Sequence, residues 1–272
     1  MEKSKLSILV LSCDDYSDLW DDFFSFKERF WPDCPYPTYL VNDMFQYERK
    51  GVTVLNAGKG VMWSTRVRKA LEKIDTPYVC PILDDHYIIR TINTKHFEEL
   101  VSFAETNNVT YLAFERRAFI QPEKDWQYMA PDLVVIPKHL KYGINTSGAI
   151  WNKQDYMKLI GEKDYSPWKF EYNMCELAKT EEGLPGLLLF DAGLTLNLCE
   201  KEIVRQGVFI PDAVKYVKEV TGVEINTTGR GTMSQWGLFV EKLRAWAAGL
   251  KYGRSFIRKT MKFLGFKFYS EE

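Results

Sequence analysis

Short apolar runs alternate with amphipathic stretches along the first half of the chain. Apolar runs of about four to eight residues that are bounded by turn chemistry suit strands buried on both faces. On this pattern, strands are predicted over residues 6–12, 38–41, 52–55, 78–83 and 110–114. Helices are predicted over residues 18–30, 94–105 and 155–160, and over a stretch near residues 64–74.

The order of these elements predicts the fold class. Strands that alternate with helices indicate crossover connections and a mostly parallel sheet. In the helix near residues 64–74, Val67, Ala70, Leu71 and Ile74 recur at helical spacing, and Ser64 is the predicted N-cap. We therefore expect an α/β fold with a Rossmann-like, mixed and mostly parallel sheet flanked by helices. The predicted domain covers residues 1–230, and residues 231–272 follow as a tail.

The tail has a different pattern, which predicts amphipathic helices. From Glu241 onward it carries eight basic and three acidic residues, so it is positively charged whereas the rest of the chain is negatively charged. A basic amphipathic helix with Trp and Phe is typical of an element that lies on a membrane surface. A helix that packs on the domain and leaves a solvated basic face would give the same pattern. The apolar positions are Trp236, Phe239, Val240, Leu243, Trp246, Ala247 and Leu250, then Ile257, Met261, Leu264 and Phe268.

Composition narrows the classes of protein. The net charge of −1 argues against a general nucleic-acid binder. An aromatic content of 15% suits either a large core or flat pocket walls. The five cysteines show no zinc-binding spacing, which favours free thiols in a reducing cytoplasm. The first apolar run is too short for a signal peptide, and no apolar run is long enough to span a membrane.

One apolar strand ends abruptly in charged residues. The segment 79–89 reads VCPILDDHYII, so Asp84, Asp85 and His86 interrupt an otherwise apolar run. Buried acids are costly unless they are paired or coordinate a cation. The carboxyl end of a central strand is also where open α/β sheets bind ligands. These residues could hold Mg²⁺ or Mn²⁺ against a phosphate, with His favouring Mn²⁺. Acids that merely cap the next turn are the alternative.

Two further groups of residues suit a nucleotide. Asp14, Asp15 and Tyr16 follow the first strand, where an Asp can accept a hydrogen bond from a base and a Tyr can stack on it. A solvated acidic turn is the alternative. The segment 58–68 reads GKGVMWSTRVR, and its Arg66 and Arg68 could bind a diphosphate at the start of a helix. This segment is neither a Walker A nor a GxGxxG motif, and exposed arginines would explain it equally well.

A last group suits a sugar and a proton transfer. Gly148 and Trp151 lie close in sequence, and Trp168 follows in the segment SPWKFE. Small residues beside a flat ring can form a shallow pocket for a sugar face. Glu171 follows the aromatic pair and could act as a general base. Core aromatics beside an exposed Glu are the alternative. The three histidines have no Ser or Cys partners in a recognised triad motif.

Taken in order, these segments resemble GT-A glycosyltransferases, and more specifically the bacterial sugar transferases of capsule and O-antigen gene clusters. The resemblance covers about residues 6–175. The segments that carry it are SCDDYSDLWDDFF, FWPDCPYPTYLVND, MWSTRVRKAL, VCPILDDHYII, GAIWNKQDY and SPWKFE.

The resemblance implies a nucleotide-sugar donor, most often a UDP-sugar. It implies that Asp14, Asp15 and Tyr16 lie near the nucleobase and that Arg66 lies near the ribose-diphosphate. It puts Asp84, Asp85 and His86 at the D-x-D position of the family. It also implies that Glu171 is the base of an inverting reaction, with Gly148, Trp151 and Trp168 on the side of the acceptor or sugar.

The same resemblance leaves the metal open. Asp85 and His86 would be the ligands of a Mn²⁺ or Mg²⁺ cofactor. Relatives often carry an aromatic residue where this chain has His86. Asp85 could therefore contact the sugar or the diphosphate without an ion.

The function that follows is sugar transfer to a saccharide or polyprenyl-linked saccharide in bacterial surface polysaccharide synthesis. Such an enzyme would be cytoplasmic and would lie on the inner face of the membrane through its tail. A nucleotidyltransferase is one alternative, although that class is expected to carry a Gly-rich loop with a Lys after the first strand, where this chain has acids. A non-catalytic, membrane-docked sugar-binding protein is another. The sequence predicts no oligomeric state.

Overall fold

The computed structural model describes residues 3–114, 126–199 and 201–238. It divides into two compact units, Met1–Lys201 and Glu202–Glu272. The predicted boundary at residue 230 stays a prediction. Most of the predicted amphipathic tail, residues 239–272, lies outside the described residues.

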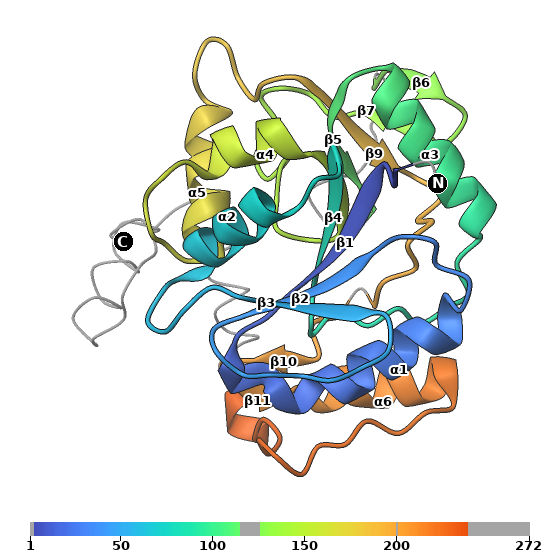
Figure 1. Cartoon of the computed structure of the whole chain (residues 1–272), viewed down its shortest axis with the longest axis vertical. Helices are drawn as coiled ribbons and strands as arrows, with labels where there is room; N and C mark the ends of the chain where they lie inside the picture. Colours follow the sequence, from blue (N-terminus) through green and yellow to red (C-terminus); the bar gives the residue numbers. More distant parts are fainter. Residues whose placement is uncertain (1–2, 115–125, 200, 239–272) are drawn as a thin grey trace. The chain divides into compact units, whose positions relative to one another are not determined.

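The first unit is built on a nine-stranded sheet with the order β3-β2-β1-β4-β8-β5-β9-β7-β6 (Figure 1). All of its strands except β7 and β8 run in the same direction. The predicted mixed, mostly parallel sheet is therefore confirmed. The strands are β1 (Leu6–Leu11), β2 (Thr38–Asn42), β3 (Val52–Asn56), β4 (Tyr78–Leu83), β5 (Val109–Ala113), β6 (Tyr128–Ala130), β7 (Leu133–Val135), β8 (Ala149–Asn152) and β9 (Leu187–Asp191).

Helices connect these strands and cover the sheet (Figure 1). In the first unit they are a 3₁₀ helix η1 (Asp14–Leu19), α1 (Trp20–Phe30), α2 (Trp63–Lys73), α3 (Thr94–Thr106), α4 (Lys153–Ile160) and α5 (Pro167–Leu177). The second unit contains a short antiparallel pair, β10 (Val204–Arg205) and β11 (Val208–Phe209), followed by α6 (Pro211–Thr221).

Aromatic packing holds α4 and α5 against the sheet. Trp151 on β8 is only 1% exposed and stacks on Tyr156 of α4, with 4.4 Å between ring centroids. Tyr111 of β5 lies 4.5 Å from the same indole, and Phe170 of α5 packs on its edge. Large rings bury much apolar area each. The high aromatic content therefore builds this core.

A second aromatic contact joins the end of α1 to α3. The rings of Trp31 and Phe97 lie 4.8 Å apart, and Phe97 stacks on Phe114 at 5.3 Å. The indole N–H of Trp31 donates to the hydroxyl of Thr94 at 3.0 Å, so the one polar atom of this large ring is paired. This contact fixes α1 and α3 relative to the end of β5.

The start of α2 differs from the sequence prediction. Met62, and not Ser64, occupies the N-cap position, and the Asp164 carboxylate accepts the Met62 N–H at 3.0 Å. The Ser64 hydroxyl instead donates to the Lys163 carbonyl at 2.9 Å and accepts from the Tyr165 N–H at 2.8 Å. The prediction of Ser64 as N-cap is wrong because its side chain ties α2 to the segment before α5.

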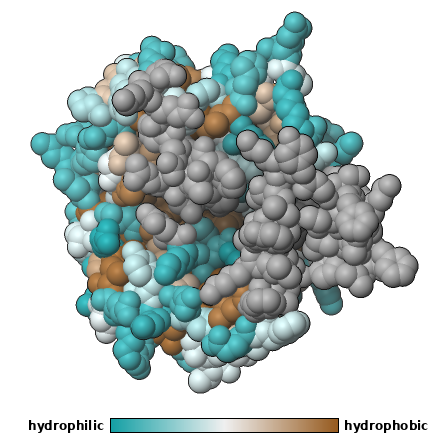
Figure 2. Space-filling model, turned by 180° about the vertical axis from the view of Figure 1, so that it is seen from behind, coloured by the Kyte–Doolittle hydropathy of each residue, from teal (hydrophilic) through white to brown (hydrophobic). Residues whose placement is uncertain are grey.

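The surface mixes polar and apolar residues. In the view of Figure 2, hydrophilic residues spread widely, with smaller hydrophobic patches between them. Large apolar side chains that are exposed include Met44, Phe45, Trp168 and Trp236. Within the described part of the chain, no helix combines the length and the apolar character needed to cross a membrane.

A stability prediction follows from the turn before β9. Gly186 has a φ of +76°, and a Cβ there would lie 1.9 Å from the Thr110 hydroxyl oxygen on β5. Gly51 has a similar φ of +78° with no atom within 4 Å of a Cβ. We expect Gly51→Ala to lower the free energy of unfolding by about 1–2 kcal/mol for the left-handed backbone alone. Gly186→Ala should lower it by about 1–3 kcal/mol more, because of the clash.

Urea unfolding of both variants and the wild type measures this difference. Equal losses for the two variants would show that Thr110 moves aside at no cost, and would contradict the prediction.

Candidate functional site

The direction of the strands brings several acids to one edge of the sheet. β1, β2, β4 and β9 run the same way, so their carboxyl ends meet at the edge where open α/β sheets bind ligands. Residues at or just after these ends are Ser12, Asp14, Asp43, Asp84, Asp85 and Asp191. We call this the carboxyl edge.

Asp14 braces the loop that follows β2. Its carboxylate accepts the backbone N–H groups of Met44 and Phe45 at 3.0 Å. Its own N–H donates to the Asp43 carboxylate at 3.1 Å. The residues predicted to contact a nucleobase, Asp14, Asp15 and Tyr16, therefore lie on η1 at the carboxyl edge. Asp15 is exposed and Tyr16 is half-buried. Its contact with a base stays a prediction.

Arg66 reaches the same place from α2. Its guanidinium lies 2.5 Å from the Asp43 carboxylate, and both side chains are less than one-fifth exposed. Asp43 was not among the predicted site residues, although it follows a predicted strand just as Asp84 does. Arg68 turns elsewhere and donates to the Gly161 carbonyl at 2.8 Å. The structure thus brings Arg66, and not Arg68, to the acids of the carboxyl edge.

Asp84 faces the end of β1. It is 4% exposed and accepts a hydrogen bond from the Ser12 hydroxyl. The Ser12 oxygen in turn accepts from the indole N–H of Trp20 at 2.7 Å. This chain of donors stabilises a buried carboxylate, as burial requires. A buried carboxylate needs such donors whether Asp84 caps a turn or belongs to a ligand site, so this contact agrees with both interpretations of the sequence.

Asp85 and His86, the predicted metal ligands, lie near each other after β4. The Asp85 carboxylate lies 3.9 Å from Nε2 of His86, which is buried. Over residues 3–114, 126–199 and 201–238, no three His, Cys, Asp or Glu side chains are grouped to hold a metal ion. The donor set supplied by these residues does not by itself fit a divalent cation, which usually takes six or so oxygen ligands. The metal stays a prediction, and no chemical step is assigned to it.

The pKa of the Cys13 thiol depends on charged residues of the carboxyl edge. Burial, and to a lesser degree the charges of Asp84 and Asp43, raise the pKa of its thiol to about 11. The Arg66 guanidinium opposes this rise. The charges of these three side chains therefore all act on one partly buried thiol.

Glu171 lies on α5, whose start is well defined. Ser166 is the N-cap and accepts the Lys169 N–H at 3.2 Å, and Pro167 follows at the first helical position. Glu171 is 9% exposed. Its Oε1 accepts both the N–H and the hydroxyl of Thr146, each at 2.9 Å. The predicted base is therefore a mostly buried carboxylate with two fixed donors, and not an exposed Glu beside the core.

Backbone contacts connect this carboxylate to the carboxyl edge. The loop of Thr146 leads into β8 at Ala149, which pairs with Ala113 at the end of β5. Next to it, a Cβ on Gly148 would lie 2.5 Å from the Leu198 side chain. The segment of Leu198 is in turn bonded to the residues after His86, since the Cys199 N–H donates to the Tyr87 carbonyl at 2.8 Å.

Asp191, at the end of β9, shapes that same segment. It is fully buried and accepts the N–H groups of Gly193 and Thr195 at 3.0 and 2.7 Å. Sequence reasoning missed it because a single acid in an apolar run gave no pattern. The buried turn at Asp191 fixes the residues that pack against Gly148.

Two of the residues predicted to contact a sugar are buried. Trp151 is a core residue whose ring contacts Tyr156 and Tyr111, so it has no open face for a sugar. Gly148 is packed against Leu198 and is equally closed. Both are core positions because β8 lies between β4 and β5 in the middle of the sheet. Trp168, in the first turn of α5, is 55% exposed.

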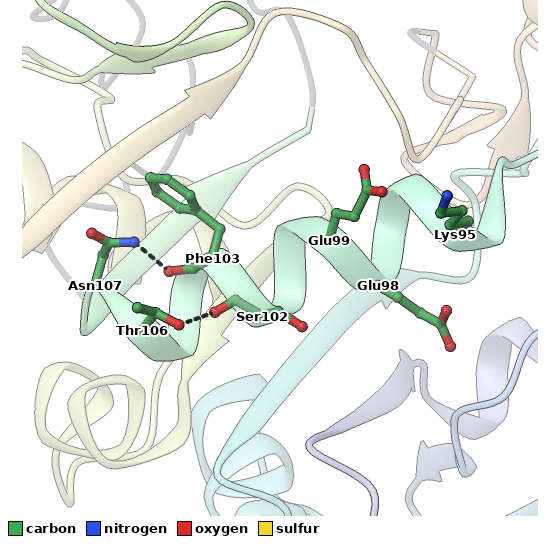
Figure 3. Close-up of a pocket in the computed structure, with 7 residues that line it drawn as sticks. All are labelled: Lys95, Glu98, Glu99, Ser102, Phe103, Thr106 and Asn107. Atoms are coloured by element: carbon green, nitrogen blue, oxygen red, sulfur yellow. Dashed lines mark hydrogen bonds between the residues drawn. The ribbon is translucent and has the colours of Figure 1, made fainter.

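A surface pocket along α3 contains none of the predicted site residues. Figure 3 shows that its side chains come from α3 and the residue that ends it. Two side-chain hydrogen bonds of 2.9 Å lie there: the Thr106 hydroxyl donates to the Ser102 carbonyl, and the Asn107 amide donates to the Phe103 carbonyl. Both join residues four apart at the end of α3. The pocket therefore has no part in the carboxyl edge.

The sheet and its acid-rich carboxyl edge define a Rossmann-like α/β domain with one arginine among its acids. The sequence matches no protein-family model. It also matches no curated protein sequence. Solved structures do show similarity in fold.

A crystal structure of TarS 1-349 from S. aureus is 14% identical, with a TM-score of 0.36; the match covers 55% of this chain and 47% of that one. This chain thus spans about half the length of that protein. The 2-C-methyl-D-erythritol 4-phosphate cytidylyltransferase of Thermus thermophilus is 11% identical, with a TM-score of 0.46 and coverages of 81% and 100%. UDP-glucose pyrophosphorylase complexed with UDP-glucose is 9% identical, with a TM-score of 0.44 and coverages of 70% and 90%.

The thiol of Cys13 provides a test of the charges at the carboxyl edge. Thiolates, and not thiols, react with iodoacetamide. Because negative neighbours disfavour a thiolate, we expect Asp43→Asn to lower the pKa of Cys13 and speed its alkylation at a pH of about 9.5, where a small thiolate fraction of such a thiol is present. Arg66→Gln should raise the pKa and slow the reaction.

Peptide mass spectrometry separates Cys13 from the other four cysteines. Equal alkylation rates in both variants and the wild type would contradict the proximity of these charges to the thiol.

Proposed function

We propose that this chain is a glycosyltransferase that moves a sugar from a nucleotide-sugar donor, a UDP-sugar in the first instance, to a hydroxyl of a saccharide acceptor with inversion. The observation that carries the proposal is the buried carboxylate of Glu171, held by two donors from Thr146. A carboxylate kept in one orientation and away from bulk water suits a general base. Its loop is connected to the carboxyl edge, where Arg66 lies among acids.

The donor would bind at the carboxyl edge. In this proposal Asp14, Asp15 and Tyr16 contact the nucleobase and Arg66 binds the diphosphate. The Asp43 carboxylate now holds the Arg66 guanidinium at 2.5 Å, so a diphosphate would share or replace that contact. Charge-assisted bonds from a guanidinium to phosphate oxygens are strong and directional. Asp84 and Asp85 would contact the sugar or the diphosphate.

The acceptor would approach from the side of α5. An acceptor hydroxyl oxygen attacks the anomeric carbon, and its proton passes to the Glu171 carboxylate. The bond from the anomeric carbon to the diphosphate oxygen breaks, and its electron pair leaves with the nucleoside diphosphate. Arg66 would stabilise the charge that grows on this leaving group. The exposed ring of Trp168, one helical turn before Glu171, would pack on the acceptor sugar.

The proposed base leads to a direct prediction. Glu171→Gln keeps the size of the side chain and its contact with Thr146, but it cannot take the proton. We expect transfer to fall by about 10²–10⁴-fold, the usual contribution of a general base, with unchanged binding of UDP. The measurement is release of the nucleoside diphosphate and product formation with a panel of UDP- and GDP-sugars that includes UDP-N-acetylglucosamine and UDP-glucose.

Glu176→Gln is the matched control, because Glu176 lies on the same helix and its side chain is 46% exposed beside Lys179. It should leave transfer unchanged. Full transfer activity in Glu171→Gln would show that Glu171 is not the general base. Pyrophosphate-dependent nucleotide exchange without transfer would favour a nucleotidyltransferase instead.

The acceptor is proposed to be a lipid-linked saccharide at the cytoplasmic membrane surface, as in bacterial surface polysaccharide synthesis. The support is the sequence of the tail, with eight basic and three acidic residues from Glu241 onward. Each basic residue near anionic lipid contributes about 1 kcal/mol.

Liposome flotation tests the membrane role of the tail. A chain that ends at Gly231 should lose binding to vesicles that contain anionic lipid. A full chain with Arg254→Gln, Arg258→Gln and Lys262→Gln should bind more weakly than the wild type. Flotation of the shortened chain to the wild-type extent would contradict the proposal.

A further inference from the structure

We propose that Thr146 is a positioning residue that orients the Glu171 carboxylate for proton transfer. This inference rests on the proposed function of Glu171 as the base. Thr146 touches neither the donor nor the acceptor in this proposal and acts only through Glu171.

The geometry assigns both donors of Thr146 to one carboxylate oxygen. The backbone N–H and the side-chain hydroxyl of Thr146 each lie 2.9 Å from Oε1 of Glu171. Two donors on one oxygen restrain the position of that oxygen, because each bond weakens steeply when its angle departs from linearity.

The loop around Thr146 is itself held on both sides. The Asn145 side-chain oxygen accepts the Ser147 N–H at 2.9 Å, which closes a tight turn across Thr146. Gly148 follows, with no room for a Cβ beside Leu198. Asn145 and Ser147 are buried, whereas Thr146 is half-buried. The turn therefore presents the N–H and the hydroxyl of Thr146 in one direction, toward α5.

The other partner is equally rigid. Glu171 sits early in α5, and the preceding residue, Phe170, is fully buried against Trp151 and Trp63. Rigid supports on both sides of a catalytic group limit its motion to the small range that proton transfer tolerates. A threonine that only filled space would not need to aim both of its donors at the same oxygen.

The test compares Thr146→Val, which loses the hydroxyl and keeps the N–H, with Thr146→Ser, which keeps both. We expect Thr146→Val to lower kcat by about tenfold, as for the loss of one bond to a charged group. The KM for UDP-N-acetylglucosamine or UDP-glucose should not change, and Thr146→Ser should restore kcat. If Thr146→Val does not fold, Thr146→Ala is measured in its place.

An unchanged kcat in Thr146→Val would overturn the inference. A loss of kcat that Thr146→Ser does not restore would also overturn it, because it would point to packing alone.

The two proposals fail in different ways. If Glu171→Gln retains full transfer, the proposed function of Glu171 falls, and with it this role of Thr146. If Glu171→Gln is inactive while Thr146→Val behaves as the wild type, Glu171 remains the base and only the positioning role of Thr146 is lost.

Discussion

A carboxylate removed from water needs hydrogen-bond donors or a cation, and the carboxyl edge of this sheet is organised by that constraint. Asp14 takes the backbone N–H groups of the loop after β2, and Asp191 takes those of the loop after β9. Asp43 takes the Arg66 guanidinium. Each acid therefore fixes the chain segment that supplies its donors, so the loops of this edge are shaped by the charges they enclose.

Glu171 follows the same rule from outside the sheet. Thr146 gives it two donors, from a loop that the packing of Gly148 and the turn at Asp191 hold in place. The aromatic core around Trp151 fixes the helix that carries it. In this way residues with apolar side chains determine where a carboxylate lies, and polar groups from distant segments are held in one place.

Much of the fold was predictable because its signals are local. Apolar runs such as residues 6–12 and 78–83 marked buried strands, and the alternation with helices predicted the mostly parallel sheet. Hydrogen bonds between distant segments and the burial of single side chains were less predictable. The predicted N-cap Ser64 instead bonds to Lys163 and Tyr165, far along the chain. A Trp beside small residues is typical of a sugar-binding wall, but Trp151 is buried because β8 lies between β4 and β5. No local sequence pattern encodes that strand order.

The sequence by itself determined the class of fold and the position of acids after strands, because hydrophobic periodicity and strand direction follow from short segments. It also identified Arg66 and Glu171 as candidate site residues. Only the tertiary structure decided that Arg66 and not Arg68 meets Asp43, that Asp84 faces Ser12, and that Thr146 holds Glu171. These choices depend on hydrogen bonds between segments far apart in the chain. The donors that satisfy a buried charge are set by packing, and packing is a property of the whole domain.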